Sequence, residues 1–285
     1  MDLCSVSELK PLLARHGFRF SKSLGQNFLI ASWVPERIAA ECGADETSGV
    51  VEIGPGVGVL TRELAKRAGK VAAVELDKAL LPVLAETLSD CPNAEVVPGD
   101  VMKLDLAALA EEKLGGLAPM VCANLPYNIT TPVLTKLLEA KLFTSITVMI
   151  QKEVAARICA APGTKDYGAF SVFCRYHADC RVLFDVAPGC FLPAPKVTST
   201  VVRLTPLAAP PVEVRDEAAF FAVVRAAFAQ RRKTLLNALS AAYGSRYSKE
   251  ELRGIIASCG LEENVRGERL GLAEFAALAE KLGGG

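Results

Sequence analysis

The fold of this chain is decided by residues 50–58, which read Val-Val-Glu-Ile-Gly-Pro-Gly-Val-Gly. A short β-branched apolar run ends at Ile53 and passes directly into the glycines, and residues 60–67 then have the apolar spacing of a helix. Glycine permits positive φ and lets the backbone approach a ligand closely. The stretch therefore predicts a strand, a ligand-binding turn and a helix. It is not the six-residue dinucleotide fingerprint, which disfavours a nicotinamide or flavin site.

Acidic residues follow the next two apolar runs. Glu75 ends the run 71–74, about twenty residues beyond Gly54, where a carboxylate can bind the two hydroxyls of a ribose. Asp100 follows the strand-like run 94–98. Each carboxylate alone could be a solvated loop residue. Because the ends of parallel strands converge on one crevice, the set predicts a site for a cofactor that contains a nucleoside.

A fourth apolar run, 119–123, is followed by Asn-Leu-Pro-Tyr at 124–127. The Asn124 side-chain oxygen and the Leu125 carbonyl can both accept hydrogen bonds from one exocyclic amine, and Tyr127 can stack on the ring that bears it. The sequence thus predicts a holder for a planar amine that accepts a methyl group. Taken alone, the tetrapeptide is equally compatible with an ordinary proline turn.

Apolar runs alternate with helical patterns up to residue 206, as in a wound parallel sheet. The last two runs have no helical pattern between them and are expected to pair as an antiparallel edge hairpin. Four amphipathic helices are predicted after Pro211. We therefore expect an α/β domain at 1–206 and a small all-helical domain at 207–285. The expected strands are 50–53, 71–75, 94–98, 119–124, 144–150, 180–186 and 198–204. The expected helices are 32–42, 60–67, 79–88, 131–139, 152–160, 168–177, 216–229, 233–242, 248–259 and 271–282.

Composition excludes several classes of protein. Hydrophobic residues make up 51% of the 285 residues, enough for a packed core. No apolar run approaches the roughly 20 residues of a membrane helix and no signal pattern is present, so a cytoplasmic location and no membrane partner are expected. The nine cysteines are scattered singly, without a CxxC pair, and only two histidines occur. Free thiols and no metal site are therefore predicted.

The net charge is zero, but the basic residues cluster. The first 25 residues are basic, and a second cluster lies at the start of a helical pattern between Phe228 and Leu235. We expect phosphate contacts at both clusters, although each could also be a solvated helix face. The residues concerned are Lys10, Arg15, Arg19 and Lys22 in the first cluster, and Arg225, Arg231, Arg232 and Lys233 in the second. A neutral protein with such patches should need shape as well as charge to select a partner that carries phosphates.

Motifs along most of the chain resemble those of the ribosomal RNA adenine N6,N6-dimethyltransferases. They are Ser-Leu-Gly-Gln-Asn-Phe-Leu (23–29), Val-Glu-Ile-Gly-Pro-Gly-Val-Gly (51–58), Val-Glu-Leu-Asp (74–77), Gly-Asp-Val (99–101), Asn-Leu-Pro-Tyr-Asn-Ile-Thr (124–130), Phe-Leu-Pro-Ala-Pro-Lys-Val-Thr-Ser (191–199) and Gln-Arg-Arg-Lys-Thr-Leu (230–235). The resemblance implies a Rossmann-like class I methyltransferase sheet with an antiparallel edge strand. It also implies an enzyme that uses S-adenosylmethionine, without a metal, to dimethylate two adjacent adenosines near the 3′ end of small-subunit rRNA.

The resemblance also assigns roles to residues. It implies that Asn27 and Leu29 cover the methionine end of the cofactor, that Gly54 lies beside its carboxylate and sulfonium, and that Glu75 and Asp100 bind its ribose and adenine. Asn124 would serve both ligands, and Gln26 and Gly56 are secondary candidates. Phe191 is expected to stack on the second face of the target adenine, unless it is an edge-strand core residue. Leu29 could likewise be simple core. Lys196 joins Lys22, Arg231, Arg232 and Lys233 as an expected RNA contact.

Two rival functions remain open from the sequence. One is a large-subunit rRNA adenine methyltransferase, which would share the amine holder and the cofactor turn. The other is a non-catalytic ribosome assembly factor with the same fold. The expected partner is small-subunit rRNA within a pre-ribosomal particle, and the expected state is a monomer.

Overall fold

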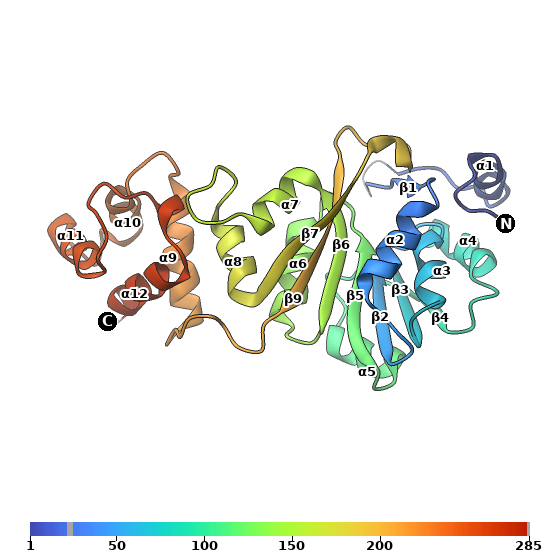
Figure 1. The fold of residues 1–285 in the computed structure, drawn as a ribbon, viewed down its shortest axis with the longest axis horizontal. Helices are drawn as coiled ribbons and strands as arrows, with labels where there is room; N and C mark the ends of the chain where they lie inside the picture. The colour runs from blue at the N-terminus through green and yellow to red at the C-terminus, as the bar shows by residue number, and fades with distance from the viewer. Residues whose placement is uncertain (22–24, 284–285) are drawn as a thin grey trace. The chain divides into compact units, whose positions relative to one another are not determined.

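The computed structural model describes residues 1–21 and 25–283. The chain divides into two compact units. The first comprises Met1–Ala155 and Cys180–Pro206, and the second comprises Ala156–Asp179 and Leu207–Gly285. Figure 1 shows the elements of both. In the part of the chain that the structure describes, every helix is too short or too polar to cross a membrane.

The first unit is built on a seven-stranded sheet in the order β4-β3-β2-β5-β6-β9-β7. Strands β2 to β6 are parallel where they pair, and β9 runs antiparallel to β6. The chain winds outward from β2 to β4 and then resumes at β5 on the other side of β2. The crevice above β2 and β5 is therefore the topological switch point of the sheet. The strands are β2 (Ser48–Ile53), β3 (Lys70–Glu75), β4 (Ala94–Pro98), β5 (Ala118–Asn124), β6 (Ser145–Gln151), β7 (Ala178–Val186) and β9 (Ser199–Pro206).

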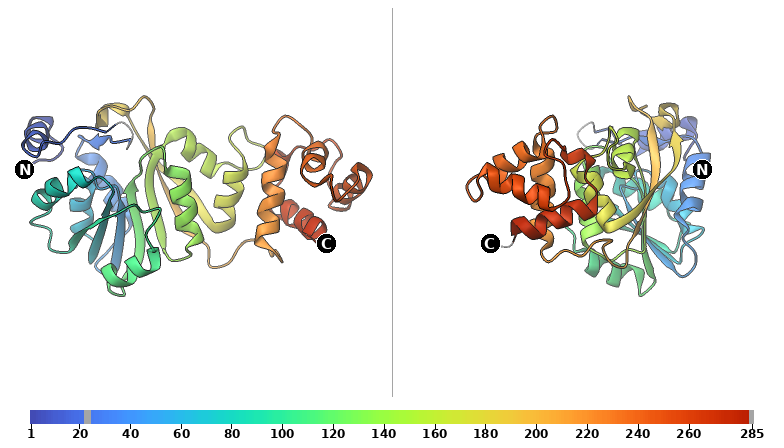
Figure 2. Two further views of the ribbon diagram at one scale, coloured as in Figure 1. Left: turned by 180° about the vertical axis from the view of Figure 1, so that it is seen from behind. Right: turned by 60° about the vertical axis from the view of Figure 1, so that its left-hand side comes forward.

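Helices cover both faces of this sheet. Figure 1 shows α2 and α3 in front of the strands, and the view from behind in Figure 2 shows α5 and α6 on the opposite face. This two-sided cover explains why all six residues of β2 are buried, the polar Ser48 and Glu52 included. The helical segments are α1 (Val6–Arg15), α2 (Trp33–Cys42), α3 (Val59–Ala65), η2 (Lys78–Leu80), α4 (Leu81–Thr87), α5 (Leu106–Leu114), α6 (Thr130–Glu139) and α7 (Lys152–Cys159).

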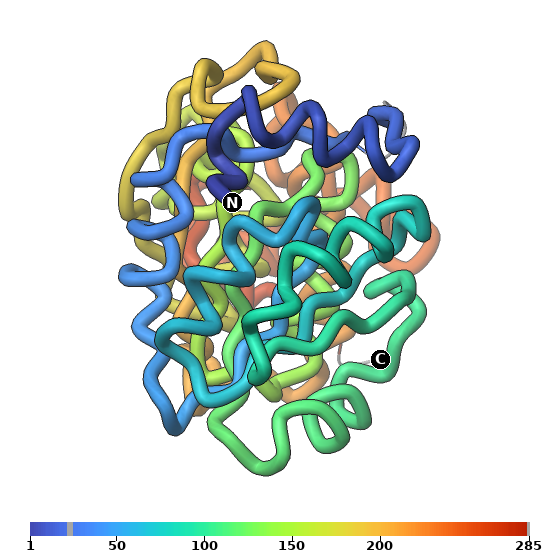
Figure 3. The backbone as a smooth tube through the Cα atoms, turned by 90° about the vertical axis from the view of Figure 1, so that its right-hand side faces the viewer, coloured from blue at the N-terminus to red at the C-terminus, as the bar shows by residue number. Residues whose placement is uncertain are grey.

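A separate two-stranded sheet joins two distant segments of the first unit. Strand β1 (Phe28–Leu29) pairs antiparallel with β8 (Phe191–Leu192), which follows the short helix η3 (Pro188–Cys190). In Figure 3 the dark blue N-terminal segment and the gold segment around β8 lie along the same edge of the unit. The pairing fixes the segment that precedes α2 over the carboxyl end of the large sheet.

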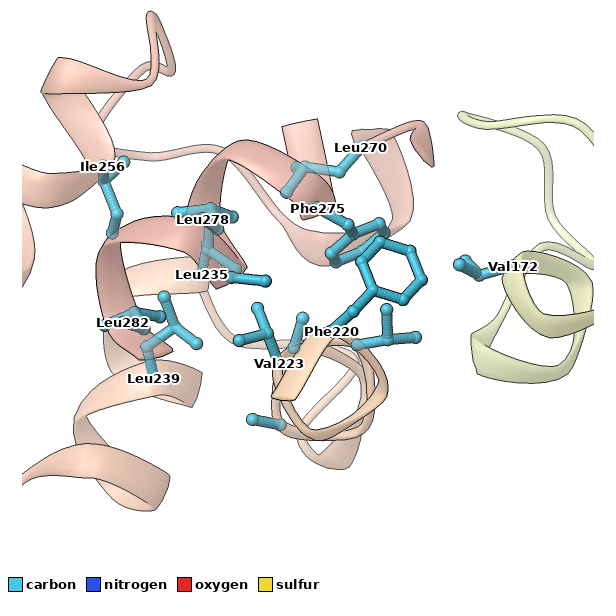
Figure 4. Packing of buried hydrophobic residues seen from close by; sticks show 14 of the residues in the cluster. Val172, Phe220, Val223, Leu235, Leu239, Ile256, Leu270, Phe275, Leu278 and Leu282 are labelled. Carbon is cyan, nitrogen blue, oxygen red and sulfur yellow. The ribbon is translucent and has the colours of Figure 1, made fainter. Parts of the chain in front are cut away.

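The second unit is helical and has its own hydrophobic core. Phe220, Leu239, Ile256 and Phe275 come from four different helices and are each at most 1% exposed (Figure 4). Fully burying one such side chain stabilises a fold by about 1.5–3 kcal/mol. The helical segments are α8 (Ala169–His177), α9 (Glu217–Ala229), α10 (Leu235–Tyr243), α11 (Lys249–Ser258), η4 (Gly267–Arg269) and α12 (Leu272–Gly283).

All seven predicted strands and all ten predicted helices are present, with ends that differ by a few residues. Among the described residues, the elements that were not expected from the sequence are α1, α5, β1, β8 and the short helices η3 and η4. The predicted boundary between residues 206 and 207 is one of three points at which the chain passes from one unit to the other. Residues 156–179, expected in the first domain, instead belong to the second unit, because Tyr167, Val172 and Tyr176 pack into its core.

Candidate active site

A cavity lies at the carboxyl ends of the central strands of the first unit. The cavity is open to solvent. Its walls come from the glycine turn after β2, the ends of β3 and β5, the turn after β4 and the segment before α2. The expected cofactor and acceptor residues that line it are Gln26, Asn27, Leu29, Gly54, Gly56, Glu75, Asp100, Asn124, Leu125 and Tyr127. The structure thus brings together ten of the residues chosen from the sequence.

The glycine turn has the backbone geometry that the sequence predicted. Gly54 and Gly56 have φ values of 70° and 61°, a region that side-chain-bearing residues rarely adopt. A Cβ atom on Gly56 would lie 3.1 Å from the Phe28 ring. The amide of Gly54 donates to the Val74 carbonyl at 2.9 Å, which fixes the turn against β3. The turn therefore brings bare backbone to the cavity surface.

Two carboxylates occupy the ends of the neighbouring strands. Glu75 is 6% exposed, and its Oε1 accepts a hydrogen bond from the Asp77 amide at 2.7 Å. Burial raises the pKa of the Glu75 carboxyl above its ordinary value. Asp100 Oδ1 accepts from the Met102 amide at 2.9 Å. Each carboxylate is thus oriented by the backbone of the turn that follows it.

The turn that carries Asp100 is hydrogen-bonded to helix α6. This helix follows residues 124–129, the acceptor loop, which begins with Asn-Leu-Pro-Tyr. Lys136 of α6 donates from Nζ to the carbonyls of Met102 and Leu104, at 2.9 and 2.6 Å. Helix α6 begins at Thr130, directly after the loop that contains Asn124. Lys136 therefore links the turn beside the expected cofactor site to the helix beside the expected acceptor site.

The segment before α2 is held by amide side chains. Gln26 donates from Nε2 to Asp77 at 2.7 Å, and its Oε1 accepts from the Ser21 amide at 2.8 Å. Asn27 donates from Nδ2 to the Gly25 carbonyl at 3.0 Å. Because both ends of the Gln26 carboxamide have protein partners, its contribution here is to hold the segment over the cavity.

The acceptor loop presents the groups that the sequence analysis expected. The Asn124 Nδ2 donates to the Asn27 carbonyl at 3.4 Å, an orientation that leaves Oδ1 as the accepting end of the amide. The Leu125 side chain is 1% exposed and its amide donates to Met149 at 3.1 Å, so any contact with a ligand would come from its carbonyl. Tyr127 lines the cavity, and burial raises the pKa of its phenol.

Phe191 does not line the cavity, in contrast to its expected stacking role. It is 2% exposed and packs in the core of the first unit, because its strand β8 pairs with β1 opposite Leu29. The alternative, an edge-strand core residue, describes its position. Leu29 belongs to the same core at 3% exposure, although it also lines the cavity.

The expected RNA contacts are distributed over the chain. Lys196 is exposed in the first unit, and Lys22 lies outside the described residues. Arg232 and Lys233 are exposed in the turn between α9 and α10, because α10 begins only at Leu235, two residues later than predicted. Arg231 in the same turn has protein partners. It donates to the carbonyls of Lys165 and Tyr167, the latter at 3.1 Å, and lies 3.6 Å from Glu268.

Glu52 is a cavity residue to which the sequence analysis gave no role. It is 1% exposed, and burial raises the pKa of its carboxyl to about 8. It lies within the Val-Glu-Ile-Gly motif, but a strand buried on both faces shows no alternation that would mark one residue as facing a ligand. The only available signal was an acidic residue inside a continuous apolar strand, which is costly to bury.

The sheet order, with its antiparallel β9, and the grouping of a glycine turn with two strand-end carboxylates define a class I methyltransferase-like protein. The family model described as ribosomal RNA adenine dimethylase matches residues 17–280. The chain belongs to this family.

Two curated relatives carry the name ribosomal RNA small subunit methyltransferase A. The protein from Alkaliphilus oremlandii is 48% identical, over 98% of each chain. That from Geobacillus thermodenitrificans is 46% identical, over 99% of this chain and 97% of the relative. Among solved structures, the 23S rRNA methyltransferase ErmE is 27% identical and superposes with a TM-score of 0.67, covering 90% of this chain and all of that one. A dimethyladenosine transferase from Plasmodium falciparum shares the fold, with a TM-score of 0.74 over 90% and 98% of the chains at 23% identity.

Proposed function

We propose that this protein transfers methyl groups from S-adenosylmethionine to N6 of two adjacent adenosines near the 3′ end of small-subunit rRNA. The observation that carries the proposal is the shared cavity of the glycine turn, the strand-end carboxylates and the Asn124 loop. The nucleoside cofactor and the acceptor amine would bind side by side there. The near-complete similarity to relatives named for the small subunit supports the same substrate.

The cavity fits S-adenosylmethionine, which when bound supplies an electrophilic methyl group on sulfonium. The bare backbone at Gly54 and Gly56 allows close approach of the methionine portion. Glu75 and Asp100 would accept hydrogen bonds from the ribose and the adenine amine. Asn27 and Leu29 would cover the methionine end. A metal has no part in this proposal, and the described residues contain no group of three or more side chains arranged to bind one.

The acceptor loop would act by positioning the amine. The N6 lone pair of adenine is delocalised into the ring, so N6 is a poor nucleophile. Hydrogen bonds to Asn124 Oδ1 and the Leu125 carbonyl would favour a pyramidal nitrogen, and in-line alignment would add a proximity effect. Tyr127 would stack on the base, worth about 1–3 kcal/mol for such contacts. The methylated nitrogen is acidic enough to lose its proton without a dedicated base.

The second unit would contribute phosphate contacts. Arg232 and Lys233 are exposed beside the N-terminus of α10, where the helix dipole also favours an anion. Arg231, with its carbonyl and carboxylate partners, would hold the turn that presents them. The zero net charge predicts a modest salt dependence for RNA binding.

The natural setting that we propose is a cytoplasmic monomer acting on rRNA within a pre-ribosomal small subunit. A large-subunit substrate is the second candidate, favoured by the fold shared with the 23S rRNA methyltransferase ErmE. That protein is 27% identical to this chain, whereas the relative from Alkaliphilus oremlandii is 48% identical. The small-subunit assignment is therefore preferred.

The test is to incubate the purified protein with labelled S-adenosylmethionine and small subunits that lack the modification. Large subunits and duplex DNA serve as competing acceptors, and the product nucleoside is identified after digestion. Dimethyladenosine from small subunits alone is the expected result. Label in large subunits would transfer the assignment to the second candidate. No label in any acceptor would instead favour a non-catalytic assembly factor.

A further inference from the structure

Glu52 places a carboxyl group in the cavity wall without a visible partner for one of its oxygens. The residue lies on the central strand β2, two positions before Gly54, and is 1% exposed. Its Oε2 is buried and makes no hydrogen bond within the described protein. A buried polar atom without a partner costs about 1–3 kcal/mol. Since Glu52 also lines the cavity, a ligand in the cavity can offset that cost.

The cavity wall is acidic. Its carboxyl groups are those of Glu52, Glu75 and Asp100, and among the described residues no lysine or arginine lines it. S-adenosylmethionine carries a sulfonium, an ammonium and a carboxylate, and thus one net positive charge when its amine is protonated. S-adenosylhomocysteine, the product after methyl transfer, has a thioether in place of the sulfonium and no net charge. An acidic wall therefore attracts the cationic donor more strongly than the product, which has no net charge.

We propose that Glu52 is the residue that discriminates the cationic donor from the neutral product, by ionising when the sulfonium compound binds and remaining protonated with the thioether. The inference rests on the proposed use of S-adenosylmethionine and deepens it. Donor binding would break the carboxyl O–H bond and release its proton to solvent. The resulting carboxylate would be compensated by the positive charge of the ligand. The product would lack that compensation and would dissociate more readily.

The surroundings of Glu52 favour its protonated form before a cation arrives. The titratable groups that face it are Glu75 on β3 and the buried Cys122 thiol on β5. Burial, and to a lesser extent the negative charge of Glu75, raise the pKa of Glu52. The carboxyl is therefore mostly neutral near pH 7. A nearby positive charge lowers the pKa of a carboxyl and drives the release of its proton.

Titration calorimetry of the wild-type protein at pH 7 tests the proton step. Each ligand is titrated in phosphate and in Tris, two buffers with different heats of ionisation. We expect close to one proton released with S-adenosylmethionine and markedly fewer with S-adenosylhomocysteine. Equal release with both ligands would overturn the proposal. Absence of any donor binding to the wild type would instead count against the proposed function.

Glu52→Gln is the decisive variant, because it keeps the shape and cannot ionise. We expect donor affinity to fall on the order of tenfold, product affinity to change less than about twofold, and the difference in proton release between the ligands to disappear. Glu52→Asp, which can still ionise, should retain part of that difference. The amine of each ligand titrates in the same pH range. Because that amine is present with every protein variant, the comparison of proton release between variants removes its contribution. Unfolding curves establish that both variants are folded. An unchanged ratio of donor to product affinity in a folded Glu52→Gln protein would refute the role.

Discussion

The hydroxyl of Tyr127 and the Oγ of Ser199 lie 2.7 Å apart. Tyr127 belongs to the loop after β5, whereas Ser199 begins β9 and is fully buried. The bond therefore joins the Asn-Leu-Pro-Tyr motif to the Phe-Leu-Pro-Ala-Pro-Lys-Val-Thr-Ser motif. It anchors the far end of the phenol ring and leaves the ring itself at the cavity wall.

Two substitutions of Tyr127 separate the role of its hydroxyl, which anchors the side chain to Ser199, from the stacking role of its ring. Tyr127→Phe should lose about 1 kcal/mol of stability, the usual worth of one hydrogen bond, and keep most methyl transfer. Tyr127→Ala should reduce transfer roughly 10- to 100-fold through lost stacking. Denaturant unfolding and kcat/KM for small subunits are the measurements. Equal activity loss in both variants would assign the effect to the anchor.

Asn124→Ala should abolish measurable transfer, with a loss on the order of 100-fold or more, and leave RNA affinity unchanged. The variant removes an acceptor for the amine whose contribution grows as the nitrogen becomes pyramidal. Single-turnover transfer and filter binding of RNA measure the two effects. The exposed Asn264, replaced by Ala, is the control. Parallel loss of RNA binding and transfer would argue for a binding role instead.

Lys136→Met should raise the dissociation constant for S-adenosylmethionine about tenfold, because two charge-assisted hydrogen bonds to the turn beside Asp100 are lost. The value of kcat at saturating donor should change little. The matched control is Lys249→Met, since Lys249 is an exposed lysine of the second unit. Lys136→Arg should recover part of the affinity. A fall in kcat with unchanged donor binding would contradict this positioning role.

The double reversal of Arg232 and Lys233 to Glu should weaken RNA binding. If each residue contacts one phosphate, the slope of log affinity against log salt should become shallower by about 2. Reversal of the exposed Lys249 and Lys281 gives the same change in net charge at other helices and serves as the control. Equal losses in the two double variants would indicate a general charge effect.

Arg231→Ala is expected to act differently from its neighbours. It removes the contacts to Tyr167 and Glu268, so the melting temperature should fall, by the equivalent of about 1 kcal/mol for a half-exposed group. RNA affinity at a temperature where the variant is folded should change less than in the double reversal. Thermal unfolding and RNA binding of the same preparation decide between the two roles.

The Glu52 carboxyl predicts a pH dependence of stability. Its pKa is raised by burial to about 8 in the folded state, from 4.5 in the unfolded chain. The unfolded chain therefore binds fewer protons between these values, and the contribution of Glu52 to stability is present below pH 4.5 and is lost as pH rises towards 8. Relative to wild type, Glu52→Gln should gain stability from pH 5 to 8, by a few kcal/mol at most. If the stability difference between the two proteins is constant over that pH range, the pKa of Glu52 is not raised in the folded state.

The order of elements and most of the site could be predicted from the sequence. Strands such as 50–53 and 71–75 were recognisable because parallel strands covered on both faces need predominantly apolar runs without alternation. The residues that end these strands share one edge of the sheet, so the strand pattern was enough to group Glu75, Asp100 and Asn124. Helix α5 was not identified, although it has an Asp105 cap and ends at a glycine.

Tertiary structure alone decided the features that depend on contacts between distant segments. The pairing of β1 with β8 buries Phe191, and a two-residue strand has no periodic signal of its own. The carbonyl partners of Arg231 come from a segment more than sixty residues earlier, so its sequence neighbours gave no reason to separate it from Arg232 and Lys233. The local pattern of the chain thus determined its strands, its helices and the chemistry at the strand ends. Packing between segments that are far apart in the sequence set which of those side chains face the cavity, face solvent or fill the core. The physical reason is that these long-range contacts determine burial and hydrogen-bond partners.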